Sequence, residues 1–177
     1  MDLLSEYKEL YYKEIEHSER LNNKIPTSIT FLSIAGTGII FLGREAFPFL
    51  CRLSNIAFMM FLVMSVALFA VSLVKFYIAY TNYSYNYFPI NDAKSRVDEG
   101  QRLIQSTRDD NTEKEVYKNI CQKFADAFIS AAIHNRVENA RKSKNHNSFI
   151  MWVFATLISV FIAFFIWALF INPYHLI

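Results

Sequence analysis

Residues 148–171 read SFIMWVFATLISVFIAFFIWALFI, and this stretch decides the fold class. It contains 24 residues, none of them Asp, Glu, Lys or Arg, and no such residue follows Lys144. A helix needs about 20 mainly apolar residues to cross the hydrocarbon core of a bilayer. The stretch therefore predicts a transmembrane helix.

Two further uncharged stretches lie upstream, at 25–43 and 53–74. The whole chain of 177 residues is 53% apolar and 16% aromatic, which is more than a water-soluble domain of this size usually carries. We therefore predict an all-α membrane protein with three transmembrane helices. The first two are expected at about 26–43 and about 53–77, and the third begins at 148.

The remaining residues form an N-terminal arm and an insertion. Residues 1–25 combine apolar positions at helical spacing with many charges, which predicts a cytosolic amphipathic helix. Residues 26–80 form a transmembrane hairpin, and residues 81–147 form a cytosolic helical segment between spans two and three. Residues 148–177 contain the third span and a short outer tail.

The distribution of positive charge predicts the orientation. Four Lys or Arg residues lie in 1–24, eleven lie in 81–147, and none follows 171. Positively charged loops stay in the cytosol. We therefore expect a multi-pass protein of the inner (cell) membrane with a cytosolic N-terminus and an outer C-terminus. Cys51 then lies outside and Cys121 inside, so the two cannot form a disulfide within one subunit.

The sequence contains no pattern typical of an enzyme. The four histidines, His17, His134, His146 and His175, are scattered and lack the helical spacing of a zinc site. The uncharged stretches at 25–43, 53–74 and 148–171 also lack the charged side chains that pumps and ion-coupled transporters usually keep at membrane depth. We therefore expect no catalytic residue, no metal site and no cofactor.

Hydroxyl side chains recur at spacings of three and four in the first and third spans. Such residues either allow helices to pack closely or line a pore, and both interpretations stay open here. Three helices enclose no aqueous path alone, so a pore would require several copies of the chain. The candidate pore-lining residues are Thr30, Ser33, Thr37, Thr156 and Ser159.

Two segments combine positive charge with groups that suit a nucleic-acid ligand. Aromatic rings stack on bases, and cations meet phosphates. For the segment on the N-terminal arm, the alternative is packing between subunits. For the segment before the third span, the alternative is binding of anionic lipid headgroups. The candidate ligand-binding residues are Tyr11, Tyr12, Lys13, His17 and Arg20 on the arm, and Arg136, Arg141 and Lys142 before the third span.

The arm KELYYKEIEHSERLNNKIP (8–26) runs directly into the first span, and IHNRVENARKSKNHN (133–147) leads into the last one. This layout resembles small membrane effectors of bacterial anti-phage defence that signal through nucleotides, including the SLATT-type effectors and the membrane effector of the Hailong system. The resemblance covers nearly the full length and rests on layout and sequence texture.

The resemblance implies a homo-oligomeric ion channel, such as a tetramer, whose cytosolic helices bind a nucleotide or a short single-stranded oligodeoxynucleotide. A partner nucleotidyltransferase would make this ligand, and opening of the channel would depolarise the membrane and abort infection. Two alternatives of other classes stay open: a non-conducting membrane adaptor or immunity-type protein, and a small transporter subunit.

Overall fold

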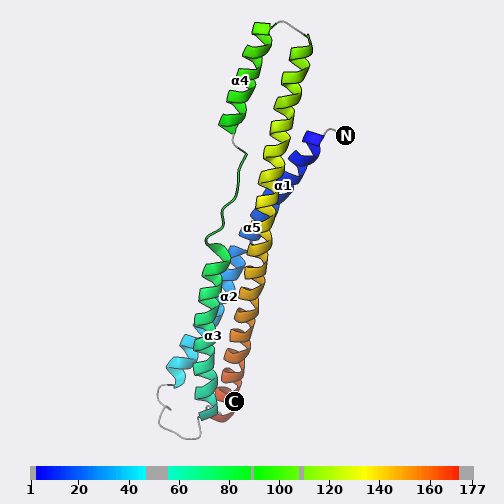
Figure 1. Ribbon diagram of the computed structural model, residues 1–177. Helices are drawn as coiled ribbons and strands as arrows, with labels where there is room; N and C mark the ends of the chain where they lie inside the picture. Colours follow the sequence, from blue (N-terminus) through cyan, green and yellow to red (C-terminus); the bar gives the residue numbers. More distant parts are fainter. Residues whose placement is uncertain (1–2, 47–55, 89, 108–109, 172–177) are drawn as a thin grey trace. The chain divides into compact units, whose positions relative to one another are not determined.

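The computed structural model describes residues 3–46, 56–88, 90–107 and 110–171, and these are helical apart from two short connections (Figure 1). The helices are α1 (Leu3–Asn22), α2 (Ile25–Ala46), α3 (Ile56–Tyr80), α4 (Ile90–Thr107) and α5 (Asp110–Ile166), followed by a π-helix at Trp167–Ile171. The all-α prediction is confirmed. Cys51 and the predicted outer tail at 172–177 lie outside the described residues.

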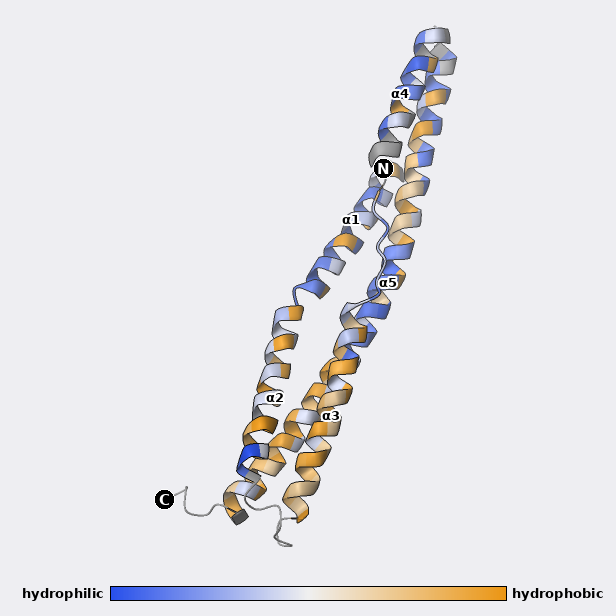
Figure 2. Ribbon diagram, turned by 90° about the vertical axis from the view of Figure 1, so that its left-hand side faces the viewer, coloured by the Kyte–Doolittle hydropathy of each residue, from blue (hydrophilic) through white to orange (hydrophobic). Residues whose placement is uncertain are grey.

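Three helical stretches are long and apolar enough to cross a membrane: Leu4–Glu45, Ile56–Tyr80 and Glu113–Leu169. Figure 2 shows the hydrophobic residues concentrated on α2, α3 and the C-terminal part of α5. The ends of α2 and α3 lie within three residues of the predicted ends of the first two spans. The third span is part of α5, a helix of 57 residues, in agreement with the absence of Pro and Gly from that part of the sequence.

The chain divides into two compact units. Residues 1–21 and 83–141 form the charged unit, which contains α1, α4 and the first part of α5. Residues 22–82 and 142–177 form the apolar unit, which contains α2, α3 and the rest of α5.

The ends of α2 and α3 follow from local chemistry. Pro26 lies in the first turn of α2, where its missing N–H would have no helical partner in any case. At the end of α3, the Thr81 N–H donates to the Tyr77 carbonyl at 3.0 Å. Asn82 then adopts a φ of 62°, a left-handed conformation that Asn tolerates better than most residues. The chain leaves α3 in the extended stretch visible in Figure 1.

Two apolar clusters hold the three helices of the apolar unit together. One contains Leu42, Phe58, Leu62, Ala163 and Trp167, and the other contains Leu32, Ala79, Phe149 and Val153. Glycine allows α2 to approach α5 closely, since a Cβ atom on Gly38 would lie 2.9 Å from Val160 Cγ1. This use of small residues at a helix interface is common in membranes.

The core of the charged unit is built around Phe128 of α5. Phe88 stacks on its ring with 4.2 Å between the centroids, and Tyr11 of α1 packs against it with 5.5 Å between the centroids. α4 lies beside α5 as the second arm of a hairpin (Figure 1). A Cβ atom on Gly100 would collide with the Ile120 side chain, so Gly100 permits this close packing.

Buried side chains of α5 recur every seven residues. In the charged unit they are Phe128 and Asn135, and in the apolar unit they are Lys142, Phe149, Thr156 and Ala163. A repeat of seven residues corresponds to 3.5 residues per turn, the spacing of left-handed supercoiled helices. In a helix wound in this way, residues seven apart lie in line along the helix. This holds on every side, including the side opposite the buried face.

Candidate functional site

The hydroxyl groups of α3 pair with those of α5 inside the apolar unit. Ser65 Oγ donates to Ser159 Oγ at 2.8 Å, and Ser72 Oγ lies 3.2 Å from Thr156 Oγ1. All four side chains are at most 2% exposed. Two of the predicted pore-lining residues, Thr156 and Ser159, are therefore placed in a helix interface of the protomer.

The hydroxyl groups of α2 lie elsewhere. Thr30, Ser33 and Thr37 are exposed, and Thr30 Oγ1 donates to the Pro26 carbonyl of its own helix at 3.0 Å. We call these three residues the α2 stripe. The five predicted pore-lining residues thus fall into two groups, of which only the α2 stripe is accessible on the protomer.

A hydrogen-bonded chain of three side chains joins all three helices of the apolar unit. Tyr80 Oη of α3 lies 2.9 Å from Ser28 Oγ of α2 and 2.7 Å from His146 Nδ1 of α5. Ser28 is 1% exposed and His146 is 7% exposed. Lys142, one turn before His146, is also buried and donates to Asn22 Oδ1. These groups fix the rotation of each helix, because each must keep its polar tip at the same junction.

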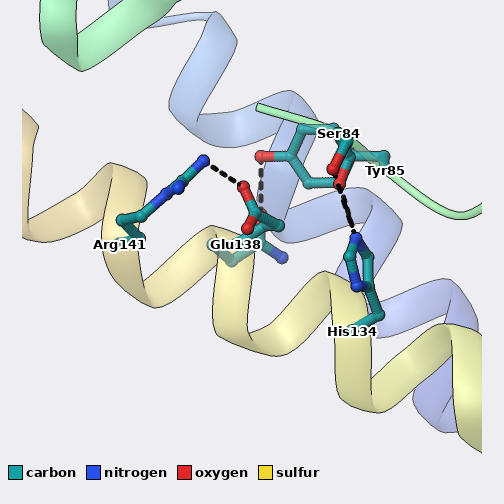
Figure 3. A network of polar contacts seen from close by, with 6 residues as sticks. Ser84, Tyr85, His134, Glu138 and Arg141 are labelled. Atoms are coloured by element: carbon teal, nitrogen blue, oxygen red, sulfur yellow. Dashed lines mark hydrogen bonds and ion pairs between the residues drawn. The ribbon is translucent and has the colours of Figure 1, made fainter. Parts of the chain in front are cut away.

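In the charged unit, side chains of α5 hydrogen-bond to the extended connection between α3 and α4. The side chain of Asn135 is fully buried; its Oδ1 accepts the Asn86 N–H at 2.8 Å, and its Nδ2 donates to the Asn86 carbonyl at 3.0 Å. His134 Nε2 lies 2.9 Å from the Ser84 carbonyl, so the tautomer that carries its proton on Nε2 donates there (Figure 3). Because these contacts reach backbone atoms, they hold the path of the connection itself. We call Asn135 and Asn139 the asparagine clamp.

Asn139 ties the same connection to α1. Its Oδ1 accepts the Tyr85 hydroxyl at 3.1 Å, while its Nδ2 donates to the Glu14 carbonyl at 2.8 Å and to Glu14 Oε2 at 2.9 Å. Burial raises the pKa of the Tyr85 hydroxyl; its hydrogen bond with Ser18 opposes this rise, and the carboxylate of Glu138 adds to it. Burial thus favours the neutral form of the Tyr85 hydroxyl.

A salt bridge lies beside the clamp. Arg141 Nη2 is 2.7 Å from Glu138 Oε2 (Figure 3). The Arg141 guanidinium also lies over the Tyr83 ring, 5.0 Å from its centroid. A cation over an aromatic face is attracted by the ring quadrupole. Arg141, predicted to bind a ligand, thus helps to hold the connection.

The other predicted ligand-binding residues are not gathered into one site. Tyr11 belongs to the core, and its hydroxyl accepts the Phe88 N–H at 3.1 Å. On the surface of α1, Lys13 pairs with Glu9 at 2.8 Å and Arg20 pairs with Glu16 at 2.7 Å. The remaining predicted residues divide between exposed positions, at Tyr12, His17 and Arg136, and the buried Lys142.

A cavity of about 690 Å³ lies among α1, α4 and α5 of the charged unit. Its size falls in the range of small-molecule sites, about 300–1,000 Å³. Apolar side chains and two aromatic rings meet two carboxamides and a carboxylate there. The residues lining it include Leu4, Val97, Gln101, Gln105, Glu113, Tyr117 and Phe124.

Sequence reasoning missed the clamp. Its signal was the spacing of Asn135, Asn139 and Lys142, four and three residues apart, which places three polar side chains on one side of a helix. The same side of the helix is buried in the structure. The positive charge of this stretch predicted contacts with a nucleic-acid ligand or with lipid headgroups, although one side of the helix lies inside the protein.

Within the described part of the chain, no three His, Cys, Asp or Glu side chains gather as a metal site would require. No protein-family model, no curated protein and no solved structure matches this chain. The observations that bear on function are therefore the α2 stripe, the paired hydroxyls of α3 and α5, the asparagine clamp and the cavity of the charged unit.

Proposed function

We propose that the chain is the subunit of a homo-oligomeric ion channel in the cell membrane that acts as an anti-phage effector. The charged unit faces the cytosol and binds a nucleotide or short oligonucleotide made by a partner nucleotidyltransferase. This signal gates the channel, and the open channel depolarises the membrane. The defence role and the ligand class rest on the resemblance in layout to SLATT-type and Hailong-type effectors.

The channel part of the proposal is carried by the α2 stripe. Ser65, Ser72, Thr156 and Ser159 satisfy one another within the protomer, whereas Thr30, Ser33 and Thr37 expose their hydroxyls from a helix of membrane length. Thr30 Oγ1 donates to the Pro26 carbonyl, but lipid tails offer the other two hydroxyls no hydrogen-bond partner. In a ring of protomers with α2 on the inner side, water would solvate the hydroxyls of the α2 stripe. The same hydroxyls would give ions a polar path.

Thiol modification of the pore tests this arrangement. Ser33→Cys is made in a chain whose Cys51 and Cys121 are replaced by Ser, and the purified protein is reconstituted into planar bilayers. A water-soluble cationic methanethiosulfonate should reduce the current of Ser33→Cys. The matched variant Ser159→Cys should be insensitive, because Ser159 is buried against Ser65.

Equal block of both variants would refute the assignment of α2 to the pore. Absence of current at every ligand concentration, including with short oligodeoxynucleotides present, would favour the non-conducting adaptor instead.

Ligand binding is tested separately from conduction. The double variant Lys13→Glu, Arg20→Glu reverses two exposed cations of α1, and Lys8→Glu is the matched control on the same helix. Tyr117→Ala removes one of the two aromatic rings that line the cavity. Loss of oligonucleotide binding in the double variant alone would place the ligand on α1, and loss in Tyr117→Ala alone would place it in the cavity. Unchanged affinity in both would reject both locations.

A further inference from the structure

α5 carries an exposed apolar stripe within the charged unit. Ile133 and Val137 are 58% and 61% exposed, and Ala140 is exposed as well. They lie on the side of the helix opposite Asn135, which is fully buried. The stripe is thus accessible on the protomer, while the clamp side is covered.

Lipid is a poor partner for this part of α5. Residues 110–144 contain twelve Asp, Glu, Lys or Arg side chains, which are expensive at membrane depth. The part of the stripe at Ile133, Val137 and Ala140 therefore lies outside the hydrocarbon region. Large apolar side chains four residues apart on one helix face are the usual contact of a second helix.

The spacing of the exposed residues indicates what kind of helix fits. Ser130, Ile133, Val137 and Ala140 are exposed at steps of three, four and three, and exposed residues continue at the same steps. They are Lys144, Asn147, Met151, Phe154 and Ile158. Alternating steps of three and four form the seam of a left-handed coiled coil. The seven-residue repeat on the buried side of α5 implies the same winding.

We propose that this stripe is the seam along which α5 of a second copy packs in parallel. The proposal rests on the homo-oligomer of the proposed function and names the surface that builds it. A second copy inserted in the same membrane has the same orientation. Its α5 can therefore contact the stripe in the charged part of α5 and also in the uncharged run. A partner without a membrane helix could follow only the first half.

The charges beside the seam provide a signature of this arrangement. In coiled-coil numbering, Val137 occupies an a position, Arg136 a g position and Arg141 an e position. In a parallel pair, a g residue lies beside the next e residue of the other helix. Arg136 of one copy would thus face Arg141 of the other, and their repulsion would weaken the assembly.

Disulfide trapping in native membranes tests the seam. Val137→Cys, in a chain whose two native cysteines are replaced by Ser, should give a cross-linked dimer on mild oxidation, because identical a positions meet in a parallel pair. Lys118→Cys is exposed on the same helix but outside the seam spacing, and should give little dimer. Equal dimer in both variants would overturn the proposal.

Charge reversal provides a second, independent readout. Arg136→Glu turns the repulsive pair into an attractive one, which should lower the dissociation constant of the oligomer by about 1.5- to 5-fold for each pair. Val137→Glu places like charges in the seam and should raise that constant by about tenfold or more. Native mass spectrometry of the purified protein measures both changes.

The outcomes separate this inference from the proposed function. If Arg136→Glu and Val137→Glu change neither the size nor the dissociation constant of the oligomer, the seam is refuted. The channel would then be assembled through another surface. A monomer in native membranes would refute the seam and the homo-oligomeric channel together.

Discussion

Replacement of Asn135 by Ala tests how the charged unit holds the connection between α3 and α4. Asn135 is 0% exposed and makes two hydrogen bonds with the backbone of Asn86, at 2.8 and 3.0 Å. A hydrogen bond contributes about 0.5–1.5 kcal/mol to stability. Loss of both should lower the free energy of local opening of the connection by about 1–3 kcal/mol.

Hydrogen exchange with single-residue resolution measures this opening in purified protein in detergent. The exchange rate of a protected amide rises as its opening free energy falls. Each 1.36 kcal/mol corresponds to a factor of ten, so the Asn86 amide should exchange about 5- to 150-fold faster in Asn135→Ala. Amides in the middle of α3 should keep their wild-type rates, since the apolar unit is unchanged.

Two further variants show whether the effect is local. Tyr11→Phe removes the acceptor of the Phe88 N–H, 3.1 Å away, and should accelerate Phe88 more than Asn86. Gln122→Ala shortens an exposed amide of the same helix and should change neither rate. The reasoning is wrong if the Asn86 rate is unchanged in Asn135→Ala, or if Gln122→Ala raises it equally.

Two more predictions follow from the packing and the titration of single side chains. Gly38→Ala should lower the free energy of unfolding relative to Gly43→Ala by about 1–3 kcal/mol, because the new Cβ would lie 2.9 Å from Val160 Cγ1, whereas nothing lies within 4 Å at Gly43. Thermal unfolding of both variants in the same detergent measures this difference. Equal midpoints would contradict the contact between α2 and α5. The raised pKa of Tyr85 means that its neutral form stabilises the fold below its ordinary pKa of about 10, and that this stabilisation is lost as the pH rises through the higher folded value. The stability difference between wild type and Tyr85→Phe should therefore shrink at alkaline pH; a difference that stays constant, or that shrinks equally for the exposed Tyr87→Phe, would argue against the buried hydroxyl.

The sequence predicted the helical class and the three membrane-length helices, but not that the third is part of one helix of 57 residues. Each of these depends on local properties. An uncharged stretch such as 148–171 has no favourable place in water, and a stretch without Pro and Gly has no reason to interrupt its helix. The ends of α2 and α3 also followed closely, because charged residues beside an apolar run mark its limits.

The candidate site was less accessible to sequence reasoning. Thr156 and Thr37 have the same side chain and both lie in uncharged stretches, yet Thr156 is buried against Ser72 and Thr37 is exposed. Tyr11 and Tyr12 are adjacent, yet Tyr11 is in the core and Tyr12 is 56% exposed. The type of a residue limits which contacts it can make. The rotation of its helix then determines which of these contacts it does make.

By itself, the sequence determined which segments are helices and which of them suit a membrane, since both follow from the transfer free energy and conformational preference of residues close together in the chain. Only the tertiary structure decided the partners: Ser159 with Ser65, and Asn135 with the backbone of Asn86. These residues are separated by 94 and 49 positions. Their pairing depends on the register and rotation of packed helices, which are set by all side chains of an interface together and are not carried by any single stretch of sequence.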